Sequence, residues 1–223
     1  VFGVVTQVQQ GCYAQAIQVR ADLLGRKPDS LSHAEAASLA LVGVTALVSM
    51  EDVAGLASGQ TVLIHAGAGG VGGFAIQYAK HVGATVWSTA SAGNYDHVKS
   101  LGADHVVDYN AVDFTQEVPA CDVVYDTIGG GVHAKSVDVV KPGGKLVHVA
   151  PPPPDFKSPR DDIEILRPNV GRDRAHMDRI TELVDAGAVR PLPITHMRLE
   201  EAAEAHRLSQ SGHVRGKIVL GVR

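Results

Sequence analysis

A glycine-rich run in the first third of the chain is the part of the sequence with the clearest chemical use. Gly67, Gly69 and Gly72 satisfy the pattern G-x-G-x-x-G, directly after an apolar run and at the start of an amphipathic one. In such a turn the first glycine permits a sharp change of direction, the second lets the backbone approach a diphosphate, and the third lets helix and strand pack closely. Amides at the start of the helix then face the phosphate oxygens, and the helix dipole favours the negative charge.

This pattern predicts a dinucleotide site. Its residues are Gly67, Gly69, Gly70, Val71 and Gly72. The alternative is a tight turn between strand and helix that binds nothing.

The segment at residues 89–94, TASAGN, bears on the choice of cofactor. In dinucleotide folds an acidic residue about 20 positions after the glycines holds the adenosine ribose. This segment has no carboxylate, and a carboxylate would repel a 2′-phosphate, whereas small hydroxyl and amide groups leave room and donate hydrogen bonds. The composition therefore favours NADP, unless these residues only begin a turn.

From Gly59 onward, apolar strands alternate with amphipathic helices. The expected strands are residues 61–66, 85–90, 105–109, 121–129, 145–150 and 163–166. The expected helices between them are residues 74–82, 96–101 and 133–140. This alternation predicts an α/β protein with a doubly wound parallel sheet of the Rossmann type.

The flanking segments differ from this rhythm. Residues 12–19 alternate like a half-buried strand, and Ser32 with Glu35 forms a capping box that opens a helix over 33–54, which Gly55 ends. Four prolines at 151–154 form either a rigid surface loop or a wall beside the ligand. Helices at 172–185 and 199–209 and a strand at 216–222 are expected toward the C-terminus.

Composition excludes several classes of protein. Lys and Arg number 20 against 24 Asp and Glu, without a basic stripe, so nucleic acid is not an expected partner. The apolar runs are shorter than the ~20 residues that span a bilayer, so no membrane is expected either. Two cysteines form neither a disulfide framework nor a metal pattern. Val1 stands where a Met would start a chain, within an alternating stretch, so we expect upstream residues to be missing.

The histidines do not form a metal-binding pattern. The chain has 11, scattered, and His65 and His148 lie within apolar strands, where a hydrogen-bonded core or crevice histidine is expected rather than a ligand. His213 is expected to be solvated and Cys12 to be a small packing residue. No catalytic acid can be named from residue types and spacing.

Several segments together resemble one family. They are AxxGGVGxxAxQxAK at 66–80, LGADHVVDY at 101–109, VVYDTIGG at 123–130, VKPGGKLVHV at 140–149, RGKIVL at 215–220 and LVGVTA at 41–46. They resemble the quinone oxidoreductase (zeta-crystallin-like) branch of the medium-chain dehydrogenase/reductases.

The resemblance implies a domain organisation. Residues 1–40 would be the tail of a GroES-like catalytic domain, 41–171 the Rossmann NADP-binding domain, and 172–223 a return segment on the catalytic domain. It also implies zinc-independent chemistry and a set of cofactor contacts. The 2′-phosphate would lie near Ser91, Asn94 and Tyr109, the nicotinamide ribose near Thr45, Thr127, Ile128 and Gly129, and the carboxamide near the backbone of Ala150.

The expected activity is NADPH-dependent hydride transfer to a small quinone, enone or carbonyl compound. The alternatives are a non-catalytic NADPH-binding module and an enoyl-reductase unit of a polyketide synthase. A cytoplasmic homodimer is expected, paired through an edge strand at 163–168 with Ile163 and Ile165 near the two-fold axis.

Overall fold

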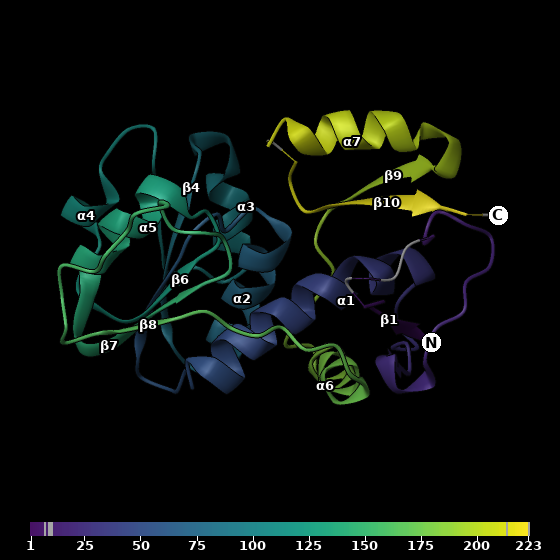
Figure 1. Cartoon of the computed structure of the whole chain (residues 1–223), viewed down its shortest axis with the longest axis horizontal. Coiled ribbons are helices and arrows are strands. Elements are labelled where there is room, and N and C mark those ends of the chain that lie inside the picture. The colour runs from purple at the N-terminus through teal and green to yellow at the C-terminus, as the bar shows by residue number, and fades with distance from the viewer. Residues whose placement is uncertain (7, 9–10, 213, 223) are drawn as a thin grey trace. The chain divides into compact units, whose positions relative to one another are not determined.

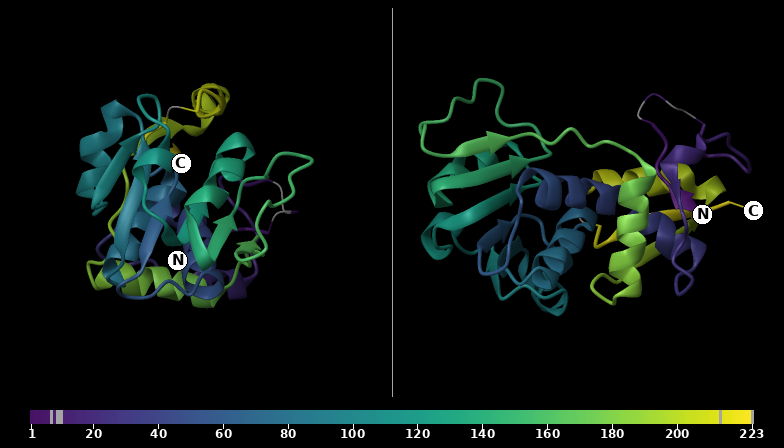
Figure 2. Two further views of the ribbon diagram at one scale, coloured as in Figure 1. Left: turned by 90° about the vertical axis from the view of Figure 1, so that its left-hand side faces the viewer. Right: turned by 90° about the horizontal axis from the view of Figure 1, so that it is seen from below.

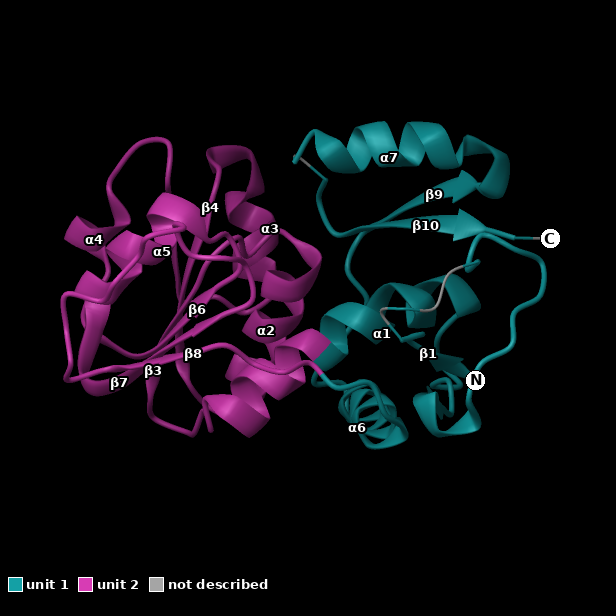
Figure 3. Cartoon of the chain, in the orientation of Figure 1, with its two compact units in different colours: residues 1–44, 171–223 teal, residues 45–170 magenta. Residues whose placement is uncertain are grey.

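The computed structural model describes residues 1–6, 8, 11–212 and 214–222, and His213 therefore lies outside the described residues. Two compact units are present, residues 1–44 with 171–223 and residues 45–170 (Figure 3). The division falls inside the helix α1 (His33–Leu47).

A six-stranded sheet organises residues 45–170. Its strands are β3 (Thr61–Ile64), β4 (Thr85–Ala90), β5 (His105–Asp108), β6 (Cys121–Asp126), β7 (Val140–His148) and β8 (Glu164–Leu166). The order is β5-β4-β3-β6-β7-β8 and every neighbouring pair is parallel. The predicted doubly wound parallel sheet is thus confirmed. Its strand order reverses between β3 and β6, and ligands of such sheets bind at this point, outside the carboxyl ends of the strands.

Helices cover both faces of this sheet (Figure 1). They are α2 (Gly70–His81), α3 (Tyr95–Ser100), α4 (Phe114–Glu117) and α5 (Gly130–Ser136), with short 3-10 turns η3 (Ala92–Asn94) and η4 (Val137–Val139). Strand β3 reads as a continuous apolar run because it is covered on both sides: Val62, Leu63 and Ile64 have no exposed surface. In both views of Figure 2 the green loop between β7 and β8 stands out from the sheet.

The unit of residues 1–44 and 171–223 has smaller sheets. Strands β1 (Phe2–Gly3) and β2 (Leu24–Gly25) pair antiparallel, and β9 (Ile194–Arg198) pairs parallel with β10 (Lys217–Gly221). Its other elements are η1 (Ala21–Leu23), part of α1, α6 (Arg174–Asp185), η5 (Leu199–Glu201) and α7 (Ala202–Gln210).

The predicted capping box opens α1. The Ser32 amide donates to the Glu35 carboxylate at 2.8 Å and the Glu35 amide donates to Ser32 Oγ at 3.2 Å, so each side chain satisfies an otherwise unpaired amide. The helix continues as a π-helical turn, η2 (Val48–Val53), and Gly55 ends it with a φ of 62°.

Two sequence-based expectations are wrong. Residues 12–19 form no strand, because most of this segment is exposed and no neighbouring strand pairs with it among the described residues. Cys12 is accordingly exposed and is not a packing residue. The sequence does not predict strand β9. Buried and exposed residues do not alternate along it, and its partner β10 lies about 20 residues later in the chain.

One stretch of the described chain, the continuous helix His33–Val53, is long and apolar enough to cross a membrane. Ser38, Thr45 and Ser49 interrupt its apolar residues, so short apolar runs in the sequence did not reveal it. Of its most apolar window, 67% is buried inside the fold. A buried core helix passes the same test, so the finding is weak evidence for a membrane span.

Candidate functional site

The glycine turn connects β3 to α2, and its residue with a positive φ lies one position before Gly67. Ala66 has a φ of 52°, the positive value that a non-glycine residue rarely adopts, whereas Gly67 does not have a positive φ. Gly67 is required for a different reason. A Cβ there would lie 2.2 Å from Ser88 Oγ, which is itself held by a hydrogen bond of 2.7 Å to the Ile64 carbonyl.

The third glycine packs helix against strand, as predicted. A Cβ on Gly72 would lie 2.4 Å from the carbonyl oxygen of Ala66, a backbone atom that cannot move aside as a side-chain end can. Gly69 is less confined, because only the same carbonyl oxygen, at 3.3 Å, lies near its Cβ position. The Gly69 amide donates to that same carbonyl at 3.0 Å, so Gly69 offers a ligand space rather than a free donor.

Helix α2 begins at Gly70 rather than at Phe74, so the glycines form its first turn. The amides of Gly70, Val71 and Gly72 have no acceptor within the helix, since residues of the first turn have no preceding carbonyl to bond. Together with the uncrowded Cβ position of Gly69, these amides fit the diphosphate of a dinucleotide at the carboxyl edge of the sheet.

Ser91, Asn94 and Tyr109 lie at the ends of the adjacent strands β4 and β5 or just after them. Ser91 directly follows β4, and the Asn94 side-chain amide donates to Ser91 Oγ at 3.1 Å. Tyr109 directly follows the neighbouring strand β5, and its amide donates to the Ala90 carbonyl at 3.4 Å. Its side chain is 55% exposed, so a phenol hydroxyl, a serine hydroxyl and an amide stand at the ends of two adjacent strands.

The turn that follows β6 is held closely by its neighbours. Thr127 Oγ1 donates to the His65 carbonyl at 2.9 Å, and the amides of Ile128 and Gly129 donate to the Asp126 carboxylate at 2.9 and 2.8 Å. Since Asp126 occupies these two amides, they are not free donors for a ligand. The Ile128 side chain is half exposed.

Ala150 and Thr45 present carbonyl groups that are already engaged. The Ala150 carbonyl accepts from His148 Nδ1 at 2.9 Å, and Pro151 next to it accepts from the Gly130 amide at 3.0 Å. The Thr45 carbonyl accepts from Ser49 Oγ at 2.6 Å and from the Tyr125 hydroxyl at 3.4 Å, where α1 passes into the π-helical turn.

His65 is a hydrogen-bonded core residue, as expected. Its Nδ1 lies 3.1 Å from Thr89 Oγ1 and its Nε2 lies 3.0 Å from Ser136 Oγ. Ser136 Oγ donates to the Val132 carbonyl, so it accepts the proton of Nε2, and the ring is neutral with Thr89 donating to Nδ1. Burial lowers the pKa of His65 to about 4.

This depressed pKa predicts an acid-labile fold. Unfolded chains bind a proton at His65 below a pH of about 6.5, and the folded chain does so only near 4. Stability is therefore complete above the unfolded pKa and falls as the pH drops toward 4, by an amount on the order of 3 kcal/mol. Urea unfolding at several pH values measures this loss, and His65→Gln should show a shallower fall than the parent. The matched control is His33→Gln, at an exposed histidine; an unchanged slope in His65→Gln would refute the assignment.

Two residues at this edge were not predicted, Asp126 and His133. Both are fully buried, and His133 Nδ1 lies 2.9 Å from Asp126 Oδ2. Burial lowers the pKa of His133. The sequence did contain an indication of the role of Asp126, because an Asp that precedes a glycine turn often accepts a hydrogen bond from the backbone amide two residues later.

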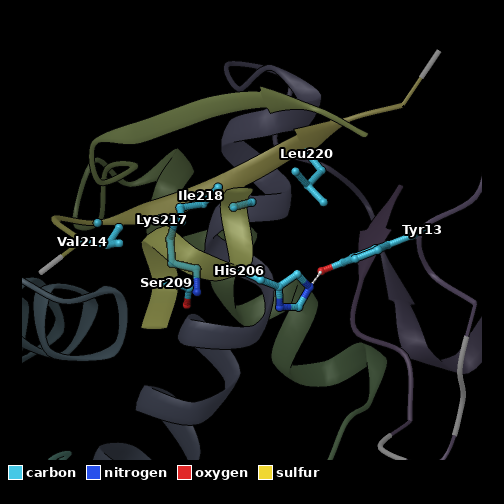
Figure 4. A pocket seen from close by; sticks show the side chains of 9 residues that line it. Tyr13, His206, Ser209, Val214, Lys217, Ile218 and Leu220 are labelled. Carbon is cyan, nitrogen blue, oxygen red and sulfur yellow. Dashed lines mark hydrogen bonds between the residues drawn. The ribbon is translucent and has the colours of Figure 1, made fainter. Parts of the chain in front are cut away.

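Two cavities lie elsewhere. One of about 230 Å³ is lined by Lys217 of β10 and by His206 of α7, whose Nε2 lies 3.0 Å from the Tyr13 hydroxyl (Figure 4). Another of about 220 Å³ lies around Lys141 and Lys145, toward the start of β7. Neither holds a residue expected to bind the cofactor. Among the described residues, no three His, Cys, Asp or Glu side chains converge as metal ligands.

Comparison with known proteins places the chain in a family. The family model described as zinc-binding dehydrogenase matches residues 101–220. The chain is 36% identical to 2-methylene-furan-3-one reductase of Solanum lycopersicum over 95% of its own length and 53% of that enzyme, and 32% identical to the mitochondrial NAD(P)H oxidoreductase of Danio rerio over 100% and 65%. It is also 35% identical to the polyketide synthase GfsB of Streptomyces halstedii, over 98% of this chain and 4% of the synthase.

Among solved structures, the quinone oxidoreductase of Coxiella burnetii superposes with a TM-score of 0.80 and 36% identity. The match covers 89% of this chain and 63% of that protein. The chain thus spans between about half and two thirds of these single-enzyme relatives. It belongs to the medium-chain dehydrogenase/reductase family, is quinone oxidoreductase-like, and covers mainly the Rossmann NAD(P)-binding part.

Proposed function

We propose that this chain binds NADPH and directs its hydride, without zinc, to a quinone or another electron-poor enone or carbonyl compound. The observation that carries the proposal is the first turn of α2, whose amides open at the carboxyl edge of the sheet beside Ser91 and Asn94. The single-enzyme relatives are named as reductases or oxidoreductases, which supports the same class of reaction.

Each part of the edge receives a role. The amides of Gly70, Val71 and Gly72 would bind the diphosphate, and Ser91, Asn94 and Tyr109 the 2′-phosphate. The turn at 127–129, Thr45 and Ala150 would lie at the nicotinamide end.

The proposed chemistry needs little acid–base help from the protein. When bound, the cofactor supplies a hydride. An electron-poor ring or conjugated carbonyl that accepts it becomes a delocalised oxyanion, which solvent can protonate. The buried histidines of the edge, His65 and His148, are already hydrogen-bonded within the fold, so the chain's own contribution is to orient the reactants.

The test is oxidation of NADPH by 1,4-benzoquinone or 9,10-phenanthrenequinone, followed by the loss of NADPH absorbance. Turnover that saturates with both reactants is the expected result. Binding of NADPH without turnover would instead support a non-catalytic module.

The match to a polyketide synthase favours a second candidate, an enoyl-reductase unit. The substrate would then be an α,β-unsaturated thioester, which has the same electron-poor double bond. Turnover of a crotonyl thioester in preference to quinones would favour this candidate.

We also propose that β8 joins two copies of the chain. It is the last strand of the sheet order, and Ile163 and Ile165 are only half-buried against the core. An edge strand exposes a row of backbone donors and acceptors, which a second copy can pair. Ile165→Pro removes one donor and should convert a dimer into a monomer in light scattering at micromolar concentration. Glu164→Ala keeps the donor and is the control; a parent that is monomeric, or a proline variant that dimerises equally, would refute this interface.

A further inference from the structure

The buried pair Asp126–His133 lies directly beneath the turn after β6. Asp126 has no exposed surface. It accepts from three N–H groups of the described chain, the amides of Ile128 and Gly129 on Oδ1 and the His133 ring on Oδ2. A carboxylate that accepts three N–H groups in a dry environment holds them strongly, because hydrogen bonds to an ionised acceptor are about twice as strong as neutral ones.

The turn has a backbone conformation that glycine adopts without strain. Gly129 and Gly130 have φ values of 76° and 53°, two consecutive residues in the left-handed region. A Cβ on Gly129 would lie 2.3 Å from the Pro151 carbonyl oxygen, so the turn also presses against the chain that leaves β7.

His133 connects Asp126 to the other segments of this edge. Its ring packs edge-on against the rings of His148 and Phe156, each at a centroid distance of 4.8 Å. His148 in turn donates to the Ala150 carbonyl. The Nε2 of His133 is buried and has no hydrogen-bond partner in the described part of the chain, so Nδ1 makes the hydrogen bond that orients the ring. One histidine therefore links the turn, α5, the end of β7 and the loop that carries Phe156.

We propose that Asp126 and His133 are positioning residues, which hold the turn Thr127–Gly129 in the shape that the nicotinamide end of the cofactor requires. The inference rests on the proposed binding of NADPH. Neither side chain touches the cofactor: the amides of Ile128 and Gly129 are turned inward onto Asp126, so the turn offers a ligand its outer surface and the Thr127 and Ile128 side chains.

The alternative is a pair that only stabilises the fold, and the two roles differ in what they do to binding. If the pair positions the turn, its substitution lowers the affinity only for ligands that carry a nicotinamide. If the pair only stabilises the fold, its substitution lowers the affinity for every ligand by the same factor. This includes 2′,5′-ADP, which would reach only the adenosine end of the site near Ser91.

The experiment compares NADPH and 2′,5′-ADP by calorimetry in the parent, His133→Phe and His133→Asn. Phenylalanine keeps an aromatic ring against His148 and Phe156 but removes the donor to Asp126. Asparagine keeps a donor near the place of Nδ1. We expect His133→Phe to lower the affinity for NADPH about tenfold and to leave the affinity for 2′,5′-ADP unchanged. His133→Asn should recover most of the affinity for NADPH.

Asp126→Asn gives the same comparison if His133→Phe does not fold, since it keeps an oxygen for the two amides but not the charge. Equal losses for both ligands, or no loss for NADPH, would overturn the positioning role. A parent that binds neither ligand would instead refute the proposed function itself, so the two failures are distinguishable.

Discussion

Gly72→Ala should destabilise the protein by about 3 kcal/mol, at the upper end of the cost of inserting a methyl group into a packed interior. The new Cβ would lie 2.4 Å from the Ala66 carbonyl oxygen, 2.9 Å from its carbon and 3.1 Å from Gly67 Cα. All three are backbone atoms of the glycine turn, so relief requires β3 and α2 to separate. The amides of the first turn would move with the helix, and NADPH binding should weaken as well. Urea unfolding and calorimetry measure the two effects.

Gly131→Ala is the matched control. Gly131 lies in α5, no atom lies within 4 Å of its Cβ position, and its φ is not positive. Alanine inside a helix restricts the unfolded chain, so this variant should gain about 0.5–1 kcal/mol. If Gly72→Ala unfolds at the same urea concentration as the parent, Gly72 is not required for close packing at the glycine turn.

The second large effect concerns cofactor choice. The glycine turn should accept NADH and NADPH alike, because both carry the same diphosphate, so the preference must arise at Ser91, Asn94 and Tyr109. Hydrogen bonds to a charged group contribute ~1.5–3 kcal/mol each. Two such bonds, partly offset by desolvation of the phosphate, predict a preference for NADPH on the order of tenfold to a few hundredfold.

Ser91→Asp should reverse this preference. The hydroxyl of Ser91 already accepts a hydrogen bond from the Asn94 amide, so a carboxylate at this position would be oriented by the same donor. It would repel a 2′-phosphate and accept from the ribose hydroxyl of NADH. Titration of both reduced cofactors into parent and variant measures the ratio of the two dissociation constants.

Ser91→Ala is the control for this substitution, because it removes the hydroxyl without adding charge. It should reduce the preference without reversing it. A parent that binds NADH as tightly as NADPH would contradict the role of these three residues, while the dinucleotide fold would remain.

Local patterns of the sequence determined most of the fold. The strand at residues 85–90 was predicted with the bounds that the structure shows, and the capping box of Ser32 and Glu35 is formed as expected. Both depend on residues a few positions apart. The doubly wound parallel sheet was predicted from the alternation of strands and helices, and the structure then supplied the order of its six strands.

Local sequence patterns also predicted part of the candidate site. Ser91 and Tyr109 could be placed at one edge because each follows a strand and the carboxyl ends of parallel strands share that edge. The hydrogen bond from Asn94 to Ser91 could not be predicted, since it depends on the 3-10 turn that places the Asn94 side-chain amide next to Ser91 Oγ.

Tertiary structure decided the features that depend on distant contacts. The need for glycine at 67 comes from Ser88 on the neighbouring strand. The absence of a strand at residues 12–19 comes from the lack of a partner strand among the described residues. The pairing of Asp126 with His133 arises because the turn after β6 brings α5 back against the end of that strand, where both side chains are buried. Residue types and spacing specify which groups a segment carries, whereas the partner of a buried polar group is chosen by the packing around it.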